Sequence, residues 1–302
     1  MGLIELTGFG SVLRLIGVLF WVIVIAALIA ALWLPKTWKG KTAAVLVVVG
    51  LFAAFPGRWA WEVKQKQDVA QARYEKAEAK FQERCKKSGV FIHRTAENVE
   101  GIFLLKLRPD GLNYGNQYRM DDPYGSDFLG EGYIEFFLRE RDESGLFNIT
   151  QAGGYGYADA IDPKDGQRYR YTGRIDQPWL HDKRYGEWVR NFVLDKVPTS
   201  DPAPRYGVTY DDISTREDRD YWIAGSSLRV IDLQTNEVMA ERIGYMMDRG
   251  QGSDPGGRSP WQSATYHACP PFPGRYKSLG QLRQTRNFVE DVLHIKQNRK
   301  DN

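Results

Sequence analysis

Two long apolar runs dominate the hydrophobic pattern near the start of the chain. The first, Leu15–Leu34, contains no charged side chain, and as a helix rising about 1.5 Å per residue it is about 30 Å long. The second covers 42–55 and is extended to residue 61 by two tryptophans. Because residues 35–41 are too few for more than a turn, the runs predict an N-terminal two-helix transmembrane hairpin with spans of about 15–34 and 42–61. A cleaved secretory signal is disfavoured, since a second apolar run follows at once.

Aromatic and basic residues flank these runs, as is typical of segments that meet a membrane interface. The expected interface anchors are Trp33, Trp38, Lys39, Lys41, Arg58, Trp59 and Trp61. The basic residues on the two sides are nearly equal in number, but three lysines are concentrated in the turn. We therefore expect an integral membrane protein in contact with the lipid bilayer, of the bacterial inner-membrane type, with the turn in the cytoplasm and the large domain extracytoplasmic. The opposite orientation is the alternative.

Residues 62–89 have the composition of a stalk helix, rich in Ala, Glu, Lys and Gln, without Pro, and ending at a Gly. Apolar or small side chains recur along it in a heptad-like stripe: Val63, Ala70, Tyr74, Ala77 and Phe81. This stripe predicts a helix that packs on its own domain. A coiled coil that joins copies into a homo-oligomer is the alternative. It is disfavoured, because Ala and Tyr in the stripe make a weak coiled-coil interface.

From residue 90 the pattern changes to short β-branched and aromatic runs separated by Pro, Asp and Gly, which predicts a mainly antiparallel β domain over 90–277. Strands are expected at 101–108, 132–140, 169–175, 188–194 and 206–210. The clearest hairpin pairs 227–233 with 237–247, with Asn236 taking a positive φ in the turn. A closing helix is expected within 278–302, with a capping box from Ser278 to Gln281. The fold class is thus a membrane-anchored α+β protein.

Charge argues against a nucleic-acid partner. The formal net charge is +3, but residues 1–61 hold five basic residues against one acidic residue, so the large domain is close to neutral. Nucleic-acid binding normally needs a clustered excess of Lys and Arg. The aromatic content, with 9 Trp, 16 Tyr and 14 Phe, instead indicates a well-packed domain.

Two cysteines and four histidines limit the candidate chemistry. Cys85 and Cys269 are expected to form a disulfide, with two separate buried thiols as the alternative. A zinc site that combines them with His93 and His267 is disfavoured, because the spacing matches no compact zinc module. No metal, cofactor or catalytic residue is assigned, since the chain has neither a GxSxG nor an HExxH motif.

A glycine-rich loop at 248–258 is the best candidate for recognition, because loops held on a sheet often carry binding residues. It lacks the ending of a phosphate-binding loop. Its candidate contact residues, with the tryptophan that follows, are Arg249, Gln251, Asp254, Arg258 and Trp261.

These observations favour a membrane-anchored, non-catalytic binding module, such as an envelope sensor, an adaptor or a protective protein of the immunity type, that recognises a protein partner or ligand near the membrane. One alternative is a membrane-tethered hydrolase that uses His181 or His267 with an acidic partner. Another is a cytoplasmic-facing ligand sensor that acts through the hairpin.

Overall fold

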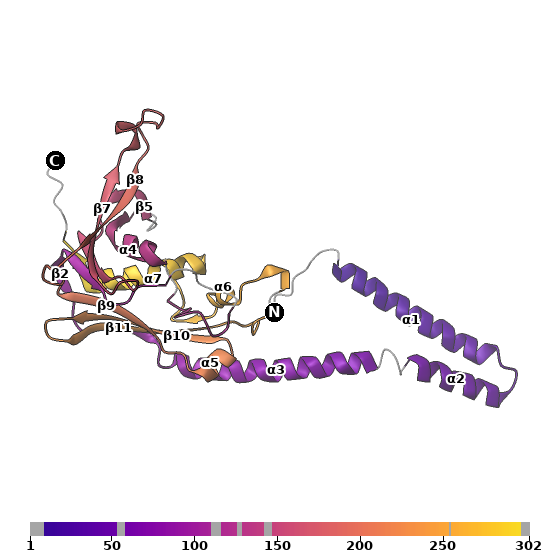
Figure 1. The fold of residues 1–302 in the computed structure, drawn as a ribbon. Coiled ribbons are helices and arrows are strands. Elements are labelled where there is room, and N and C mark those ends of the chain that lie inside the picture. The colour runs from indigo at the N-terminus through magenta and orange to yellow at the C-terminus, as the bar shows by residue number, and fades with distance from the viewer. Residues whose placement is uncertain are drawn as a thin grey trace. The chain divides into compact units, whose positions relative to one another are not determined.

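The computed structural model describes residues 9–52, 58–109, 116–125, 129–141, 147–253 and 255–296. The chain divides into two compact units, Met1–Arg73 and Tyr74–Asn302. The first unit is helical, and the second combines helices with a large sheet (Figure 1).

The first unit contains α1 (Phe9–Trp33), α2 (Trp38–Phe52) and the beginning of α3 (Arg58–Cys85). The expected pair of helices forms, and the ring centroids of Phe20 and Phe52 lie 5.8 Å apart between α1 and α2. The Oγ1 of Thr37 accepts the amide hydrogen of Gly40 at 3.2 Å, which caps the start of α2. Many apolar side chains of α1 and α2 are exposed, and Ala31 is the one buried side chain among those described for these two helices.

The expected membrane crossing is wrong. In the part of the chain that the structure describes, no helix is both long enough and apolar enough to cross a membrane. The 15 residues of α2 extend about 22 Å, less than the hydrocarbon thickness of about 30 Å. The transmembrane hairpin of 15–34 and 42–61, the membrane-anchored fold class and the integral inner-membrane localisation are therefore all corrected.

The role of the expected interface anchors stays a prediction. The four tryptophans among them, Trp33, Trp38, Trp59 and Trp61, are exposed. Lys39 and Lys41 lie in the first turn of α2, and Arg58 forms an ion pair with Glu62 at 3.2 Å within α3.

A nine-stranded sheet organises the second unit, in the order β1-β11-β10-β9-β3-β6-β7-β8, with β12 paired to β11. Its strands are β1 (Gly89–Ile92), β3 (Gly101–Leu104), β6 (Tyr157–Ile161), β7 (Arg168–Asp176), β8 (Asn191–Pro198), β9 (Tyr206–Asp212), β10 (Ile223–Asp232), β11 (Glu237–Met247) and β12 (Ala268–Cys269). Two further sheets have two strands each: β2 (Ala96–Val99) with β13 (Leu293–Ile295), and β4 (Arg139–Arg141) with β5 (Phe147–Ala152).

The large sheet is mixed, but most of its neighbouring strands pair antiparallel, as the sequence predicts. β3 lies between β6 and β9 and runs parallel to both, and the other neighbours pair antiparallel. Parallel neighbours need a long crossover connection, and the segment between β3 and β6, which includes α4 (Gly130–Leu138), provides one. The α+β character of the prediction is confirmed for this unit.

The predicted hairpin is confirmed as β10 and β11. Their register runs from the pair Ile223 and Met247 to the pair Asp232 and Glu237, and Asn236 has a φ of 59° in the turn. The strands expected at 169–175 and 206–210 are present as β7 and β9. β3 ends at residue 104 rather than 108, and β8 begins at residue 191 rather than 188.

One expected strand is a helix. Residues 132–140 contribute to α4, whose buried side chains are Tyr133, Ile134, Phe136, Phe137 and Leu138. Apolar residues three and four apart share a helix face, and a short apolar run does not by itself distinguish a helix from a strand. Packing of this face on the sheet decides the outcome, since Tyr133 and Phe137 join the main core with residues of β3, β6 and β9.

Helices cover both faces of the sheet near β10 and β11. One cluster joins α3 to these strands and contains Ala77, Phe81, Ile223, Tyr245 and Met247. The adjacent strand residues Ala224 and Met246 point to the opposite face, because side chains alternate along a strand. There they pack with Trp222, with Phe272 and with Trp261 of α6 (Pro260–Ala264). The later part of the predicted stalk stripe thus packs on its own domain, as expected, and the homo-oligomer through the stalk stays a prediction.

The closing helix is present as α7 (Lys277–Val292), and its apolar face enters the main core through Phe288, Val289 and Val292. The expected capping box does not form, because the helix begins two residues earlier, with Tyr276 at the N-cap in place of Ser278 and no side-chain cap. The short helices α5 (Arg216–Asp220), η2 (Pro178–Leu180) and η3 (Pro255–Gly257) complete the described elements.

Candidate functional site

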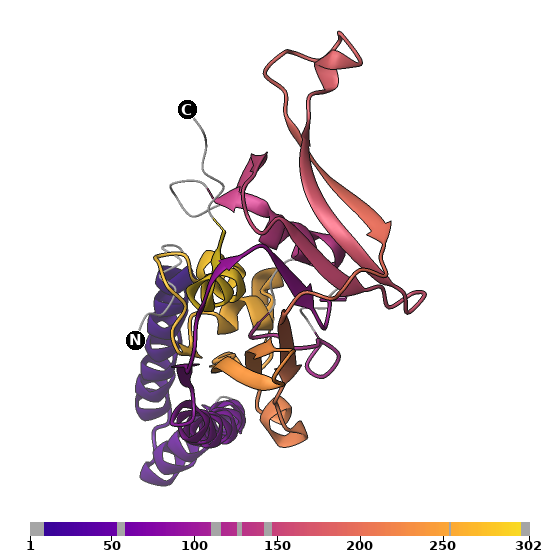
Figure 2. The ribbon, with the colours of Figure 1, turned by 90° about the vertical axis from the view of Figure 1, so that its left-hand side faces the viewer.

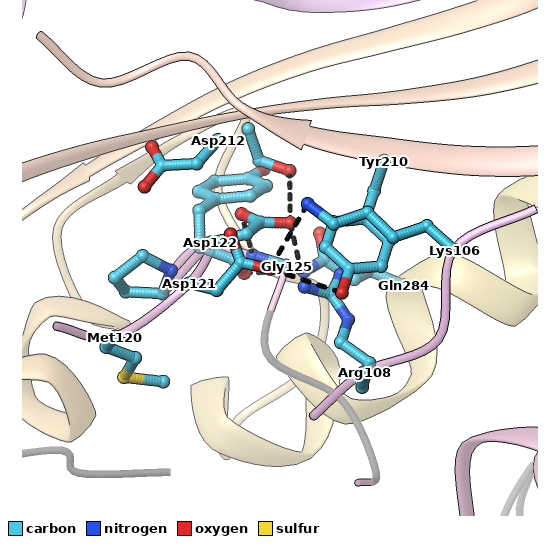
Figure 3. Close-up of polar contacts among 12 residues, drawn as sticks. Lys106, Arg108, Met120, Asp121, Asp122, Gly125, Tyr210, Asp212 and Gln284 are labelled. Atoms are coloured by element: carbon cyan, nitrogen blue, oxygen red, sulfur yellow. Dashed lines mark hydrogen bonds and ion pairs between the residues drawn. The ribbon is translucent and has the colours of Figure 1, made fainter. Parts of the chain in front are cut away.

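A buried cluster of polar side chains lies between the sheet and the segment 116–125 (Figure 3). We call it the buried polar centre and define it as Arg108, Asp122, Tyr210 and Ser226. The carboxylate of Asp122 is fully buried and accepts hydrogen bonds from Arg108 Nη1 and Ser226 Oγ, each at 2.9 Å. It also accepts the amide hydrogen of Gly125 at 3.0 Å, and Asp122 itself has a φ of 44°.

The ring of Tyr210 completes this centre. The Cζ of Arg108 lies 3.6 Å from the ring centroid, so the guanidinium contacts the aromatic ring as well as the carboxylate. The phenol donates to the carbonyl of Leu107 at 3.0 Å, and burial raises the pKa of Tyr210. At the edge of the centre Lys106 pairs with Asp121 at 3.2 Å. The phenol therefore stays protonated and serves as a hydrogen-bond donor within the fold.

Amide side chains of α7 hold the same segment from the other side. Gln281 and Gln284 donate to the carbonyl of Tyr124 at 3.1 and 2.8 Å, and Gln284 accepts from Arg242 Nη1 at 2.7 Å. Burial raises the pKa of Tyr124 to about 12. These buried contacts position segment 116–125 and leave little surface for a substrate, so the buried polar centre has the properties of a structural network.

A cavity of about 200 Å³ lies next to Arg108. Its other lining residues are Leu107, Pro109, Gly130, Glu131, Ile134, Asp162, Pro163, Lys164 and Tyr171. The hydrogen bond from Lys196 keeps the pKa of Asp162 below its usual value. Pockets for small-molecule ligands usually measure about 300–1,000 Å³. This cavity is smaller, and its acidic and basic groups are mixed, so it is a weak candidate for a ligand or cofactor site.

The predicted recognition loop is organised around a residue that the sequence analysis did not single out. Asp248 is buried, accepts the amide hydrogens of Gly250 and Gly252 at 3.0 and 2.8 Å, and forms an ion pair with Arg258. These contacts fold the loop against the domain.

The predicted contact residues of this loop lie in different environments. Gln251 donates to the carbonyl of Tyr221 at 2.9 Å, and Trp261 is buried with its indole N–H on the carbonyl of Asn116 at 2.9 Å. Arg249 is exposed, and Asp254 lies outside the described residues. Recognition through this loop stays a prediction, although Arg258 and Trp261 already serve the fold.

The predicted disulfide is confirmed. Cys85 and Cys269 are bonded, with their Cα atoms 5.6 Å apart, and they join the end of α3 to β12. Beside this bond His267 Nε2 lies 3.0 Å from Glu78 Oε2, and its ring packs on Phe81 with centroids 4.5 Å apart. Burial lowers the pKa of His267. The histidine therefore belongs to the contact between α3 and β12.

The histidines of the hydrolase alternative lie in separate places. His267 pairs with Glu78, whereas His181 is exposed, with its Nε2 3.7 Å from Asp176. Within the described ranges neither histidine is hydrogen-bonded to a hydroxyl or a thiol that could act as a nucleophile. Nor do the described residues contain a group of three or more His, Cys, Asp or Glu side chains placed to hold a metal ion.

A projecting hairpin is the feature that the sequence analysis missed. β7 and β8 pair from Tyr169 with Pro198 to Asp176 with Asn191, and they extend beyond the rest of the second unit in both views (Figures 1 and 2). We call residues 168–198 the arm and residues 177–190 its tip. Two adjacent predicted strands, with Trp, Leu and Tyr between them and a Trp at the start of the second, were the signal that could have identified it.

The backbone of the tip is ordered by its own hydrogen bonds. Asp182 N donates to the carbonyl of Pro178 at 2.8 Å, Tyr185 N to that of Asp182 at 3.2 Å, and Val189 N to that of Gly186 at 3.0 Å. The tip nevertheless presents large apolar side chains to solvent: Leu180 is 55% exposed, Tyr185 51% and Trp188 83%. An ordered backbone that exposes such side chains is a candidate protein-binding surface.

Comparison of the chain with protein-family models, with curated proteins and with solved structures found no match. The function is therefore inferred from the chain's own geometry, and the arm tip is the described surface that most resembles a recognition site.

Proposed function

We propose that this chain is a non-catalytic binding module that recognises a protein partner through the tip of its arm. The observation that carries the proposal is Trp188, an indole 83% exposed on a tip whose backbone is fixed by internal hydrogen bonds. Tryptophan and tyrosine dominate the binding energy of many protein interfaces, because they bury a large area at little cost in side-chain entropy.

The buried carboxylates of the domain support the same proposal, because their partners lie within the domain itself. The carboxylates of Asp122, Asp218, Asp232 and Asp248 are fully buried, and each is engaged by arginine or by backbone amides within the domain. Paired, buried carboxylates of this kind stabilise a fold and are not poised for proton transfer to a substrate. The arm tip, in contrast, offers surface that the domain itself leaves uncovered.

Site-specific photocrosslinking tests the proposal. A photoreactive tryptophan analogue, which keeps the indole, is placed at position 188 of the full chain and should give one dominant crosslinked protein. The same amino acid at position 266 is the matched control, since Tyr266 is 69% exposed but lies outside the arm. The crosslinked protein is then purified, and its affinity for the wild type, Trp188→Ala and Tyr266→Ala is measured.

We expect Trp188→Ala to weaken binding by about 30-fold, the effect of losing an interface hot spot, and Tyr266→Ala to change it by less than about twofold. Equal crosslinking at the two positions, or equal affinities of the two variants, would show that the arm tip is not the binding surface. A crosslink to a second copy of this chain would replace the separate partner with self-association.

A further inference from the structure

The arm tip carries both an aromatic side chain and an excess of positive charge, and together they describe the surface that it fits. We infer that the partner presents an apolar pocket rimmed by carboxylates, and that Trp188 fills the pocket while Lys183 and Arg190 face the rim. This inference rests on the proposed function, because it names the chemistry of the partner at the same site.

The apolar part of the argument comes from how the indole is held. A Cβ added to Gly186 would lie 2.4 Å from Nε1 of Trp188, so the glycine makes room for the indole at this position. Leu180 and Tyr185 are the other exposed large apolar side chains of the tip. The exposed surface of the indole requires a complementary apolar pocket on the partner.

The charge argument depends on which ionic groups of the tip are already paired. Arg184 donates to the carboxylate of Asp182 from Nε at 2.9 Å and from Nη2 at 2.6 Å, so this acid and this base neutralise each other. These hydrogen bonds from Arg184 lower the pKa of Asp182, which keeps the carboxylate ionised and matched.

Two cations of the tip are left without an acidic partner among the described residues. Lys183 Nζ lies 4.6 Å from the centroid of the Trp179 ring, and Arg190 Nη1 donates to the carbonyls of Glu187 and Val189 at 2.6 and 3.1 Å. Glu187 is the one tip carboxylate without an ion pair in the described ranges. The tip contains three basic and two acidic residues. Charge complementarity therefore favours an acidic partner surface.

A single-stranded nucleic acid is the other class of molecule that binds aromatic and basic side chains together. The arm fits it less well, because the carboxylates of Asp176, Asp182, Glu187 and Asp195 are interspersed with the cations and would repel phosphates. An acidic protein surface, with discrete carboxylates around an apolar pocket, can avoid these positions. Nucleic acid is thus kept as an outcome of the test.

The experiment uses the full chain and, as probe, the protein crosslinked at position 188. Its affinity is measured at low and at high salt for Trp188→Ala, for the double variant Lys183→Glu/Arg190→Glu, and for a control with the same charge change, Lys86→Glu/Lys87→Glu. The control lysines are exposed and lie after α3, away from the arm. A urea titration of every variant shows whether it is folded. We expect all of them to fold, because none of these side chains belongs to the buried core.

We expect the tip double variant to bind about tenfold more weakly than the wild type at low salt, with a smaller difference at high salt, because salt screens exposed charges. The control should change affinity by less than about twofold. Gly186→Ala provides an independent check on the pocket: it keeps the tryptophan and the charge but displaces the indole, so it should weaken binding in the same direction as Trp188→Ala.

The outcomes separate the two proposals. If Trp188→Ala weakens binding while the tip double variant matches its control, the acidic rim is wrong and the proposed function stands. If neither affects binding, or if no protein is crosslinked at position 188 above the control at 266, both fail. If a single-stranded oligothymidylate binds the wild type, competes with the partner and is released by Lys183→Glu/Arg190→Glu, the acidic protein surface is replaced by a nucleic acid.

Discussion

The buried polar centre and the arm tip are built from the same kinds of side chain but differ in what covers them. In the centre the guanidinium of Arg108 lies 3.6 Å from the ring centroid of Tyr210, and in the tip Lys183 lies 4.6 Å from that of Trp179. The centre also provides a fully buried carboxylate, whereas the tip leaves cations without an acidic partner among the described residues. A cation next to an aromatic ring therefore indicates a partner-binding surface only where no carboxylate of the domain already pairs with the cation.

The two regions also differ in how they are assembled. Arg108, Asp122, Tyr210 and Ser226 come from four separate stretches of the chain, whereas the tip is one continuous stretch, 177–190. Loss of a group in the centre disturbs several elements at once. Loss of a group in the tip should affect the tip alone, and the following predictions test that contrast.

The largest expected effect comes from the disulfide, which lies outside both regions. Cys85→Ser/Cys269→Ser should lower the free energy of unfolding by about 4–5 kcal/mol, because the bond closes a loop with a sequence separation of 184 residues. Urea denaturation measures the change. Binding through the tip should stay at the wild-type level under conditions in which the variant is folded. A parallel loss of affinity would show that the tip depends on the distant core.

Asp122→Ala should lower the free energy of unfolding by about 4 kcal/mol, nearly as much as loss of the disulfide. The substitution removes the carboxylate that pairs with the buried guanidinium of Arg108. Ser226→Ala removes one hydrogen bond to the same carboxylate and should cost about 1 kcal/mol. Both values come from urea denaturation. A cost below 1 kcal/mol for Asp122→Ala would indicate that the centre is open to water, which would contradict its structural role.

Acid should lower the free energy of unfolding in a pH range set by Asp232. The hydrogen bond from Arg205, opposed by burial, and a further one from Arg94 hold the pKa of Asp232 at about 2. An unfolded aspartate titrates near pH 3.9, so the ionised carboxylate stabilises the fold fully above about pH 4, and this contribution is lost as the pH falls toward 2. Asp232→Asn should thus cost about 2 kcal/mol at pH 7 and much less near pH 2. Unfolding titrations of both proteins across this range provide the comparison, and a constant difference would exclude the carboxylate as the cause.

The smallest expected effect on stability is that of the tip. Trp188→Ala should change the free energy of unfolding by less than about 0.5 kcal/mol, as is usual for an exposed residue, although the same substitution removes most of the proposed binding. Urea denaturation again provides the value. A cost above 1 kcal/mol would mean that the indole packs within the fold and is not presented to a partner.

Local signals in the sequence predict the local parts of the structure. Periodicity, turn chemistry or composition was enough to predict four features: the hairpin with Asn236 in its turn, the strands β7 and β9, α3 with its buried Phe81, and the disulfide. The strand expected at 132–140 becomes α4, because a short apolar run is compatible with both conformations and packing on the sheet selects one. Within the described residues the apolar runs form helices as expected, over 15–33 and 42–52, but hydropathy alone led to the wrong conclusion about a membrane crossing.

The candidate sites also differ in whether local sequence signals or the packing of distant strands determines them. The buried polar centre could not be predicted, since nothing in the sequence relates Arg108 to Ser226 until β3, β9 and β10 are placed side by side. The arm tip could have been predicted in part, because Trp179 and Tyr185 lie between two predicted strands and Trp188 begins the second of them. Its projection beyond the domain depends on the position of β7 and β8 at the end of the sheet order.

The pairing of β1 with β11 has a consequence for how the chain matures on the ribosome. Residues 89–92 find their partners only at residues 240–243, and Cys85 finds its partner still later, at Cys269. At a synthesis rate of about 5–20 residues per second, the segment from 85 to 92 waits about 10–30 s for the strand that completes it. During that interval residues 89–92 have no partner strand for their backbone hydrogen bonds, and Cys85 carries an unpaired thiol. The last quarter of the chain therefore decides whether its early segments fold productively.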